Sequence, residues 1–133
     1  MDNHFGDGAF AFQPWKTPFE NSDIELVDVA YSEGRALIFR VRAHESGSIY
    51  RVCFEHVSAF RVLDEHGLLE LWEKTRESGG RPARTTFQVR NHLWTKESTI
   101  SFVTSDGWSY VVASHFDCVE VVTANLPSIT LEA

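Results

Sequence analysis

Residues 98–123 read STISFVTSDGWSYVVASHFDCVEVVT, and this stretch decides the fold class. Its first apolar residues run into Asp106-Gly107, a pair that favours the positive backbone dihedrals of a hairpin turn. Residues 108–113 then alternate large and small side chains, as expected of a strand whose two faces differ. After a break at 114–117, the extended pattern resumes over 118–122. The stretch therefore predicts an antiparallel meander, and we expect the protein to be built on a sheet.

The segments upstream show the same two-residue period. They are residues 24–31, 35–43, 49–57, 59–63 and 85–92. In the first of them the apolar phase shifts after Leu26, which predicts a β-bulge or burial on both faces. Short turns join the segments, including one over 45–48 that contains Gly47. We therefore predict an α+β fold that is mainly β, an antiparallel sheet or half-open barrel of about five to eight strands with one short helix.

The predicted helix lies where the period changes, between Asp64 and Glu77. Asp64 is a residue type that caps helices. The apolar side of such a helix would hold Leu68, Leu69, Trp72 and Thr75. The alternative is a hairpin turn at 64–67 followed by a strand over 68–72. We favour a helix with Leu68–Thr75 as its main part, because the apolar residues recur at intervals of three and four.

The length of 133 residues fits a single domain over 1–133. We divide it into an irregular, aromatic-rich N-terminal segment (1–22), a sheet core (23–124) and a C-terminal tail (125–133) along the surface. The aromatic residues of the first segment are Phe5, Phe10, Phe12, Trp15 and Phe19. Because such side chains are costly to leave in water, we expect them to pack on the domain or across a homodimer formed through this segment.

Charge narrows the class of partner. The 12 Lys and Arg against 19 Asp and Glu give a net charge of −7, which argues against binding to nucleic acid or to an anionic membrane. An acidic surface suits solubility or a basic protein partner. The first residues lack the basic start and apolar run of a signal peptide, and no stretch approaches the ~20 apolar residues of a membrane span. We therefore expect a cytoplasmic protein with a protein partner.

His115-Phe116-Asp117-Cys118 is the densest group of potential ligands and catalytic side chains. Zinc needs three or four ligands that converge on one point, whereas an extended backbone turns Cys118 away from His115 and Asp117. We therefore expect no metal and no cofactor, and a turn in which Asp117 makes local hydrogen bonds. A hydrolase-like enzyme that uses His115 and Asp117 remains an alternative.

Cys53 and Cys118 are the two cysteines, and both lie in strand-like apolar runs. A thiol nucleophile needs an electropositive setting, but Cys118 is flanked by Asp117 and Glu120. We therefore expect both thiols to be buried and inert. The sequence leaves open whether the two are close enough to form a disulfide.

Two charged stretches are candidates for recognition. The acidic one holds Asp64, Glu65, Glu70, Glu73 and Glu77, with Trp72 at its border. An acidic helix face beside an aromatic side chain is where we expect a basic protein to bind. The basic one, Arg76–Arg90, has Phe87 and Trp94 nearby, a combination that can stack nucleic-acid bases. Its acidic border and the charge of the whole chain favour a solvated loop instead.

Two stretches carry a resemblance to known proteins. They are Phe54–Trp72 (FEHVSAFRVLDEHGLLELW) and Trp108–Val122 (WSYVVASHFDCVEVV). They resemble small, acidic, uncharacterised bacterial proteins, some of which are immunity proteins that neutralise toxins delivered between competing cells. The resemblance implies stoichiometric binding to a cognate toxin, with no need for catalytic residues.

Three functions follow from these observations. The first is a non-enzymatic protein-binding domain, most concretely an immunity protein that neutralises a cognate toxin. The second is a small apolar-ligand-binding domain, whose curved sheet would be lined by Phe39, Phe54, Phe102, Trp108 and Tyr110. The third is the enzyme described above. A filled core favours the first function, and an aromatic cavity favours the second.

Overall fold

The computed structural model describes residues 11–32, 36–64, 85–90, 108–114 and 116–132. These residues form nine strands and no helix. The strands are β1 (Ala11–Pro14), β2 (Ile24–Tyr31), β3 (Leu37–Ala43), β4 (Ile49–Phe54), β5 (Ala59–Asp64), β6 (Thr86–Arg90), β7 (Ser109–Ala113), β8 (Asp117–Val122) and β9 (Ser128–Glu132). The predicted antiparallel β architecture is confirmed, and the described part of the chain is all-β.

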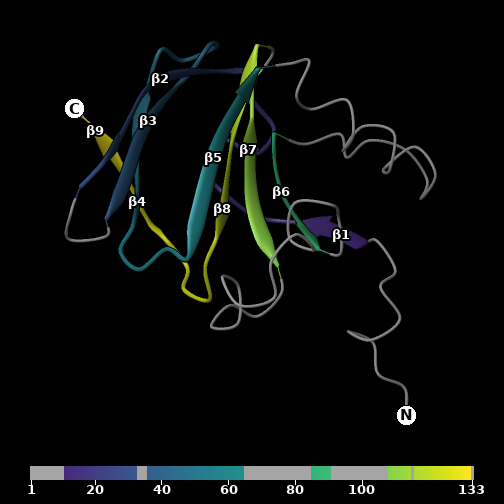
Figure 1. Ribbon diagram of the computed structural model, residues 1–133. Helices are drawn as coiled ribbons and strands as arrows, with labels where there is room; N and C mark the ends of the chain where they lie inside the picture. The colour runs from purple at the N-terminus through teal and green to yellow at the C-terminus, as the bar shows by residue number, and fades with distance from the viewer. Residues whose placement is uncertain (1–10, 33–35, 65–84, 91–107, 115, 133) are drawn as a thin grey trace.

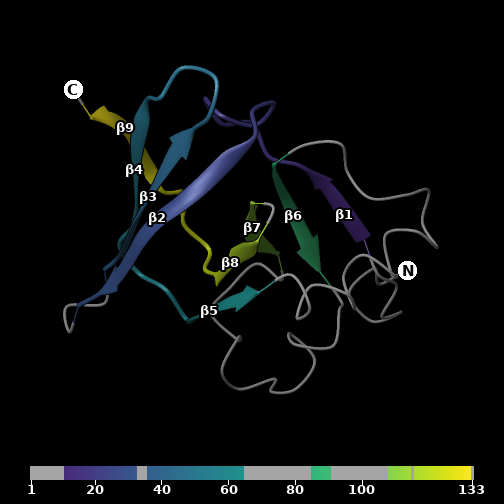
Figure 2. The ribbon, with the colours of Figure 1, turned by 90° about the horizontal axis from the view of Figure 1, so that it is seen from above.

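The strands form two sheets, which face each other in Figures 1 and 2. One is five-stranded, in the order β1-β6-β7-β8-β5, and the other is four-stranded, in the order β2-β3-β4-β9. Every pairing is antiparallel. The prediction of one sheet or a half-open barrel of five to eight strands is therefore corrected to a two-sheet sandwich, because no strand pairing among the described residues joins one sheet to the other.

Side-chain alternation explains why these segments face each other. In β3, the side chains of Leu37, Phe39 and Val41 are buried, whereas those between them are only partly covered. A strand with one apolar face must bury that face against another layer. The predicted irregularity in β2 is confirmed, since the register with β3 shifts between Leu26 and Asp28. Gly47 has a φ of 73° in the turn after β3, a conformation that glycine adopts without strain.

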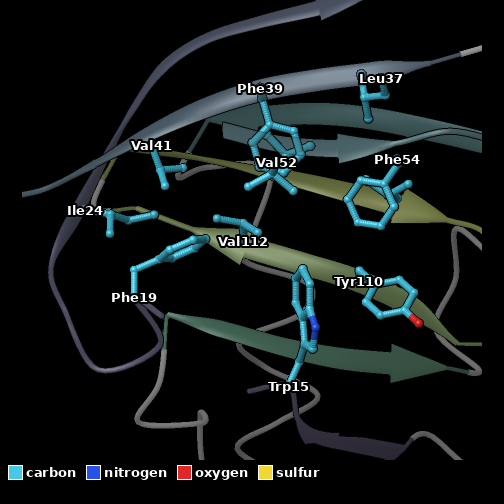
Figure 3. Packing of buried hydrophobic residues seen from close by; sticks show 12 residues of the cluster. Trp15, Phe19, Ile24, Leu37, Phe39, Val41, Val52, Phe54, Tyr110 and Val112 are labelled. Atoms are coloured by element: carbon cyan, nitrogen blue, oxygen red, sulfur yellow. The ribbon is translucent and has the colours of Figure 1, made fainter. Parts of the chain in front are cut away.

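The space between the sheets is filled by a single apolar cluster (Figure 3). The Trp15 ring lies 4.9 Å from that of Tyr110 and 6.3 Å from that of Phe54, centre to centre. Phe39 stacks on Phe54 at 6.2 Å. Trp15 and Phe19 are 7% and 0% exposed, so the expectation that N-terminal aromatic residues pack on the domain is confirmed for these two.

A second apolar cluster lies on the outer face of the five-stranded sheet. It contains Phe87, Val89, Val111, Ala113 and Cys118. The hairpin of β7 and β8 is therefore buried on both faces, and all five residues of β7 are buried. This double burial explains the nearly continuous apolar character of the sequence there.

Some expectations from the sequence differ from the structure at its edges. The segment predicted to be irregular contains β1, which pairs with β6 and packs Phe12 on the second cluster. The residues predicted to be a surface tail contain β9, whose backbone pairs with β4 over 128–132. Asp64, predicted to cap a helix, instead ends β5 opposite Asp117. The predicted helix Leu68–Thr75 and the Asp106-Gly107 turn lie outside the described residues.

Candidate functional site

The structure describes only one residue of the predicted acidic surface. Asp64 is exposed at the end of β5. The others lie outside the described residues, and they are Glu65, Glu70, Trp72, Glu73 and Glu77. Asp64 lies directly across from Asp117 of β8, so the structure places the start of the acidic stretch beside the predicted polar cluster. The sequence separates these two residues widely and gave no indication of this proximity.

The polar cluster forms a tight turn between β7 and β8. The Ser114 hydroxyl accepts the backbone N–H groups of Phe116 and Asp117, with N–O distances of 3.2 and 3.1 Å. The same hydroxyl lies 2.9 Å from Asp117 Oδ1, to which it donates. The prediction of a turn in which Asp117 makes local hydrogen bonds is confirmed. His115 lies outside the described residues.

This turn borders a pocket at one end of the sandwich, which we call the end pocket. Its volume is about 260 Å³. The apolar part of its lining is Ile24, Leu26 and Phe116, and the polar part is Glu25, His44, Ser114 and Asp117. The lining therefore combines the start of β2, the turn after β3 and the turn between β7 and β8. It draws on both sheets, so only the folded sandwich creates it.

Phe116 is a highly exposed aromatic residue in the lining of the end pocket. Its side chain is 76% exposed, the highest value among the large exposed hydrophobic residues of the described chain. Its backbone N–H is held by Ser114, so the ring stands on a hydrogen-bonded turn. Aromatic residues, phenylalanine included, are enriched at protein interfaces relative to the rest of the surface, so Phe116 is a candidate contact residue.

The carboxylates at the end pocket differ in their surroundings. Glu25 Oε1 accepts a hydrogen bond from Arg42 at 3.0 Å. Asp117 Oδ1 accepts one from Ser114, whereas Asp117 Oδ2 has no hydrogen-bond donor within the described part of the chain. Asp117 therefore keeps acceptor capacity for a group from outside.

The chemistry required of a hydrolase is not assembled in the described residues. A serine nucleophile needs a base that takes its proton, but the Ser114 hydroxyl is engaged in hydrogen bonds with Phe116 and Asp117 that build the turn. No group of three His, Cys, Asp or Glu residues in this part of the chain could hold a metal ion.

The two thiols lie on opposite sides of the molecule. Both are free. Cys118 belongs to the outer cluster of the five-stranded sheet, whereas Cys53 alternates with inward-facing Val52 and Phe54 and so lies on the outer face of the four-stranded sheet. Stacked sheets are about 10 Å apart, which is too far for a disulfide. Burial, with a contribution from Glu120, raises the pKa of Cys118 to about 12. The expectation of a buried thiol is confirmed for Cys118, which is 1% exposed, and is wrong for Cys53, which is only partly buried.

A buried charged group was missed from the sequence. Glu120 is 0% exposed, and its carboxylate accepts hydrogen bonds from Arg61 at 2.9 Å and from Ser109 at 2.7 Å. The signal was present, because Glu120 interrupts the apolar run CVEVV in a strand buried on both faces. This network ties together β5, β7 and β8.

The aromatic residues proposed to line a ligand cavity have other partners. Phe54 packs on Phe39, Tyr110 and Trp15, and Tyr110 also packs on Trp15. The Trp108 ring lies under the Arg90 guanidinium at 4.7 Å, and Phe102 lies outside the described residues. In the basic stretch, Phe87 is fully buried, so its ring is not available to stack on a base.

Among the described residues, no helix has the length and apolar character needed to cross a membrane. Comparison with protein-family models found no match, and comparisons with curated proteins and with solved structures found none either.

Proposed function

We propose that this chain is a non-enzymatic protein-binding domain, and most concretely an immunity protein that neutralises a cognate toxin. The aromatic packing between the two sheets of the described residues is the observation that carries the proposal. Trp15, Tyr110 and Phe54 pack ring against ring between the sheets, where a ligand-binding domain would keep a lined cavity. Because the described residues between the sheets pack on one another, we assign recognition to the outer surface.

Two further observations support binding over catalysis. The Ser114 hydroxyl has a structural role in the turn, and the raised pKa of Cys118, about 12, keeps that thiol protonated at neutral pH. Phe116 is exposed, and phenylalanine is among the aromatic residues enriched at protein interfaces.

The charge of the chain indicates the class of partner. A net charge of −7 attracts a basic protein and speeds its association. We assign this attraction to the acidic stretch Asp64–Glu77 and to the carboxylates of the end pocket. Reversing Glu70, Glu73 and Glu77 to Lys slows association with a basic partner, and the difference shrinks at high salt because screening already weakens the wild-type attraction.

The test uses the gene next to the one that encodes this chain, which the proposal expects to encode a toxin. The toxic region is expressed in a bacterial host alone and together with this chain. We expect growth arrest alone, restored growth with the chain, and a complex of one copy of each by light scattering.

A titration in vitro separates binding from catalysis. The toxin's activity is measured while the chain is added. A binding protein suppresses the activity in proportion to its amount and completes the suppression at one equivalent. Loss of toxin activity at a small fraction of an equivalent would show that the chain acts as an enzyme. The absence of a complex would contradict the proposal that the chain binds the toxin.

A further inference from the structure

The geometry of the end pocket points to its occupant: a lysine or arginine side chain presented by the protein partner. This inference rests on the proposed function in one respect, namely that the partner is a protein. It adds the site of contact and the chemistry that the contact recognises.

The size of the pocket selects a single side chain. Sites for small-molecule ligands usually enclose about 300–1,000 Å³, and the end pocket measures about 260 Å³. One long side chain that enters from a partner's surface needs less room than a free ligand. The partner's surface around that side chain makes further contacts beside the pocket, and these contacts add affinity.

The lining matches both parts of a basic side chain. Lysine and arginine carry an apolar stem and a charged head, and they lay the stem along apolar surface. Ile24, Leu26 and Phe116 supply that surface in the lining of the pocket. A cation beside an aromatic face gains a further attraction.

The charged head has a defined acceptor. Asp117 Oδ2 has no donor within the described residues, and a hydrogen bond between a cation and a carboxylate is among the stronger ones in proteins. The other carboxylate of the lining, Glu25, is paired with Arg42. Asp64, directly across from Asp117 in the sheet, adds negative potential from the neighbouring strand.

The turn holds the two contact groups in place before the partner arrives. The Ser114 hydroxyl fixes the backbone of both Phe116 and Asp117 and also orients the Asp117 carboxylate. Groups that are fixed in advance lose less conformational freedom on binding. The same hydroxyl therefore positions an apolar wall and an anionic acceptor for one ligand.

The first experiment titrates N-acetyl-lysine N-methylamide into the isotope-labelled full chain. Binding is monitored by two-dimensional NMR. The matched probe is N-acetyl-norleucine N-methylamide, which has the same stem without the charge. We expect saturable shifts of the Leu26, Phe116 and Asp117 amides with the lysine probe only. In Asp117→Asn, whose side-chain oxygen still accepts from Ser114, binding weakens about tenfold. Equal binding of both probes, or shifts confined to another region, would overturn the assignment.

The second experiment uses the purified toxin region from the test above. Asp117→Asn and Phe116→Ala should each weaken its binding at least about tenfold. Leu126→Ala is the matched control, because that side chain is 73% exposed and lies beyond the opposite end of β8. Melting temperatures check that each variant is folded.

The outcomes separate this inference from the proposed function. If the toxin region binds both pocket variants as tightly as the wild type, the end pocket is not the contact and the proposed function stands. If the lysine probe fills the pocket but no complex forms with the toxin region, the pocket chemistry stands and the proposed function fails.

Discussion

The guanidinium of Arg61 lies 2.8 Å from the carboxylate of Glu120, which is completely buried. The two residues are direct cross-strand neighbours on β5 and β8, and Ser109 of β7 completes the network. A buried ion pair is a poor source of net stability, because removing two charges from water offsets most of their attraction. The pair instead specifies the register of β5 against β8, since a one-residue slip of β5 would separate the two residues.

Replacing Arg61 with Leu should destabilise the protein by about 3 kcal/mol, because it removes a principal partner of a buried carboxylate. The double variant Arg61→Leu with Glu120→Leu should be more stable than the single variant, since no charge then needs compensation. Urea denaturation of the wild type, the two single variants Arg61→Leu and Glu120→Leu, and the double variant measures the coupling free energy between the two residues. Strictly additive effects would show that the pair does not act as a unit.

Replacing Ser114 with Ala should cost about 1–2 kcal/mol, because the hydroxyl satisfies two backbone N–H groups in the turn. Ser128→Ala is the matched control, since Ser128 is exposed on the edge strand β9. That control should change the free energy of unfolding by less than about 0.5 kcal/mol. Equal effects of the two substitutions would mean that the turn does not depend on its serine.

Replacing Trp15 with Ala should destabilise the fold by about 3–5 kcal/mol, as expected for truncating a large core aromatic residue. The ring bridges Tyr110 and Phe54 from opposite sheets, and no neighbour can close such a gap. Thermal melting compares it with Leu126→Ala, whose side chain is exposed. A melting temperature unchanged from the wild type would show that Trp15, and with it the N-terminal segment, does not stabilise the core.

The two thiols should react with a water-soluble reagent at different rates. Cys118 is 1% exposed and its pKa is raised to about 12, so it stays a protected thiol at pH 8. Cys53 is only partly buried. We expect one reacting thiol in the native protein and two in denaturant, and Cys53→Ser should abolish the native reaction. Two rapidly reacting thiols in the native protein would contradict the burial of β8.

The sequence predicted the strands well because alternation is a local signal. The bounds of β2 agree fully with the predicted 24–31, and its bulge was foreseen from the apolar phase. The division into two sheets was not predictable in the same way. It depends on which strands hydrogen-bond to which, and β1 with β6 or β4 with β9 are pairings between distant segments.

The candidate site shows the same limit. The Ser114–Asp117 turn could be predicted, because it is built from residues three positions apart. The end pocket could not, since Leu26 and His44 approach Phe116 only when both sheets are in place. Strand β9 lies in the segment predicted to be a surface tail, although its residues alternate in burial as a strand does.

The pairing of distant strands also has a kinetic consequence. Strands β2, β3 and β4 are consecutive neighbours joined by short turns, so they can associate early, whereas β1, β5 and β9 must wait for partners far along the chain. Closing such long loops is slow. Destabilising substitutions in β3 should therefore slow refolding, whereas those in β9 should mainly speed unfolding, and stopped-flow fluorescence distinguishes the two. The reverse pattern would place the folding nucleus at the late strands.

Until the late strands pair, the edges of the early strands are exposed and can pair with another molecule. The yield of refolded protein should therefore fall as protein concentration rises.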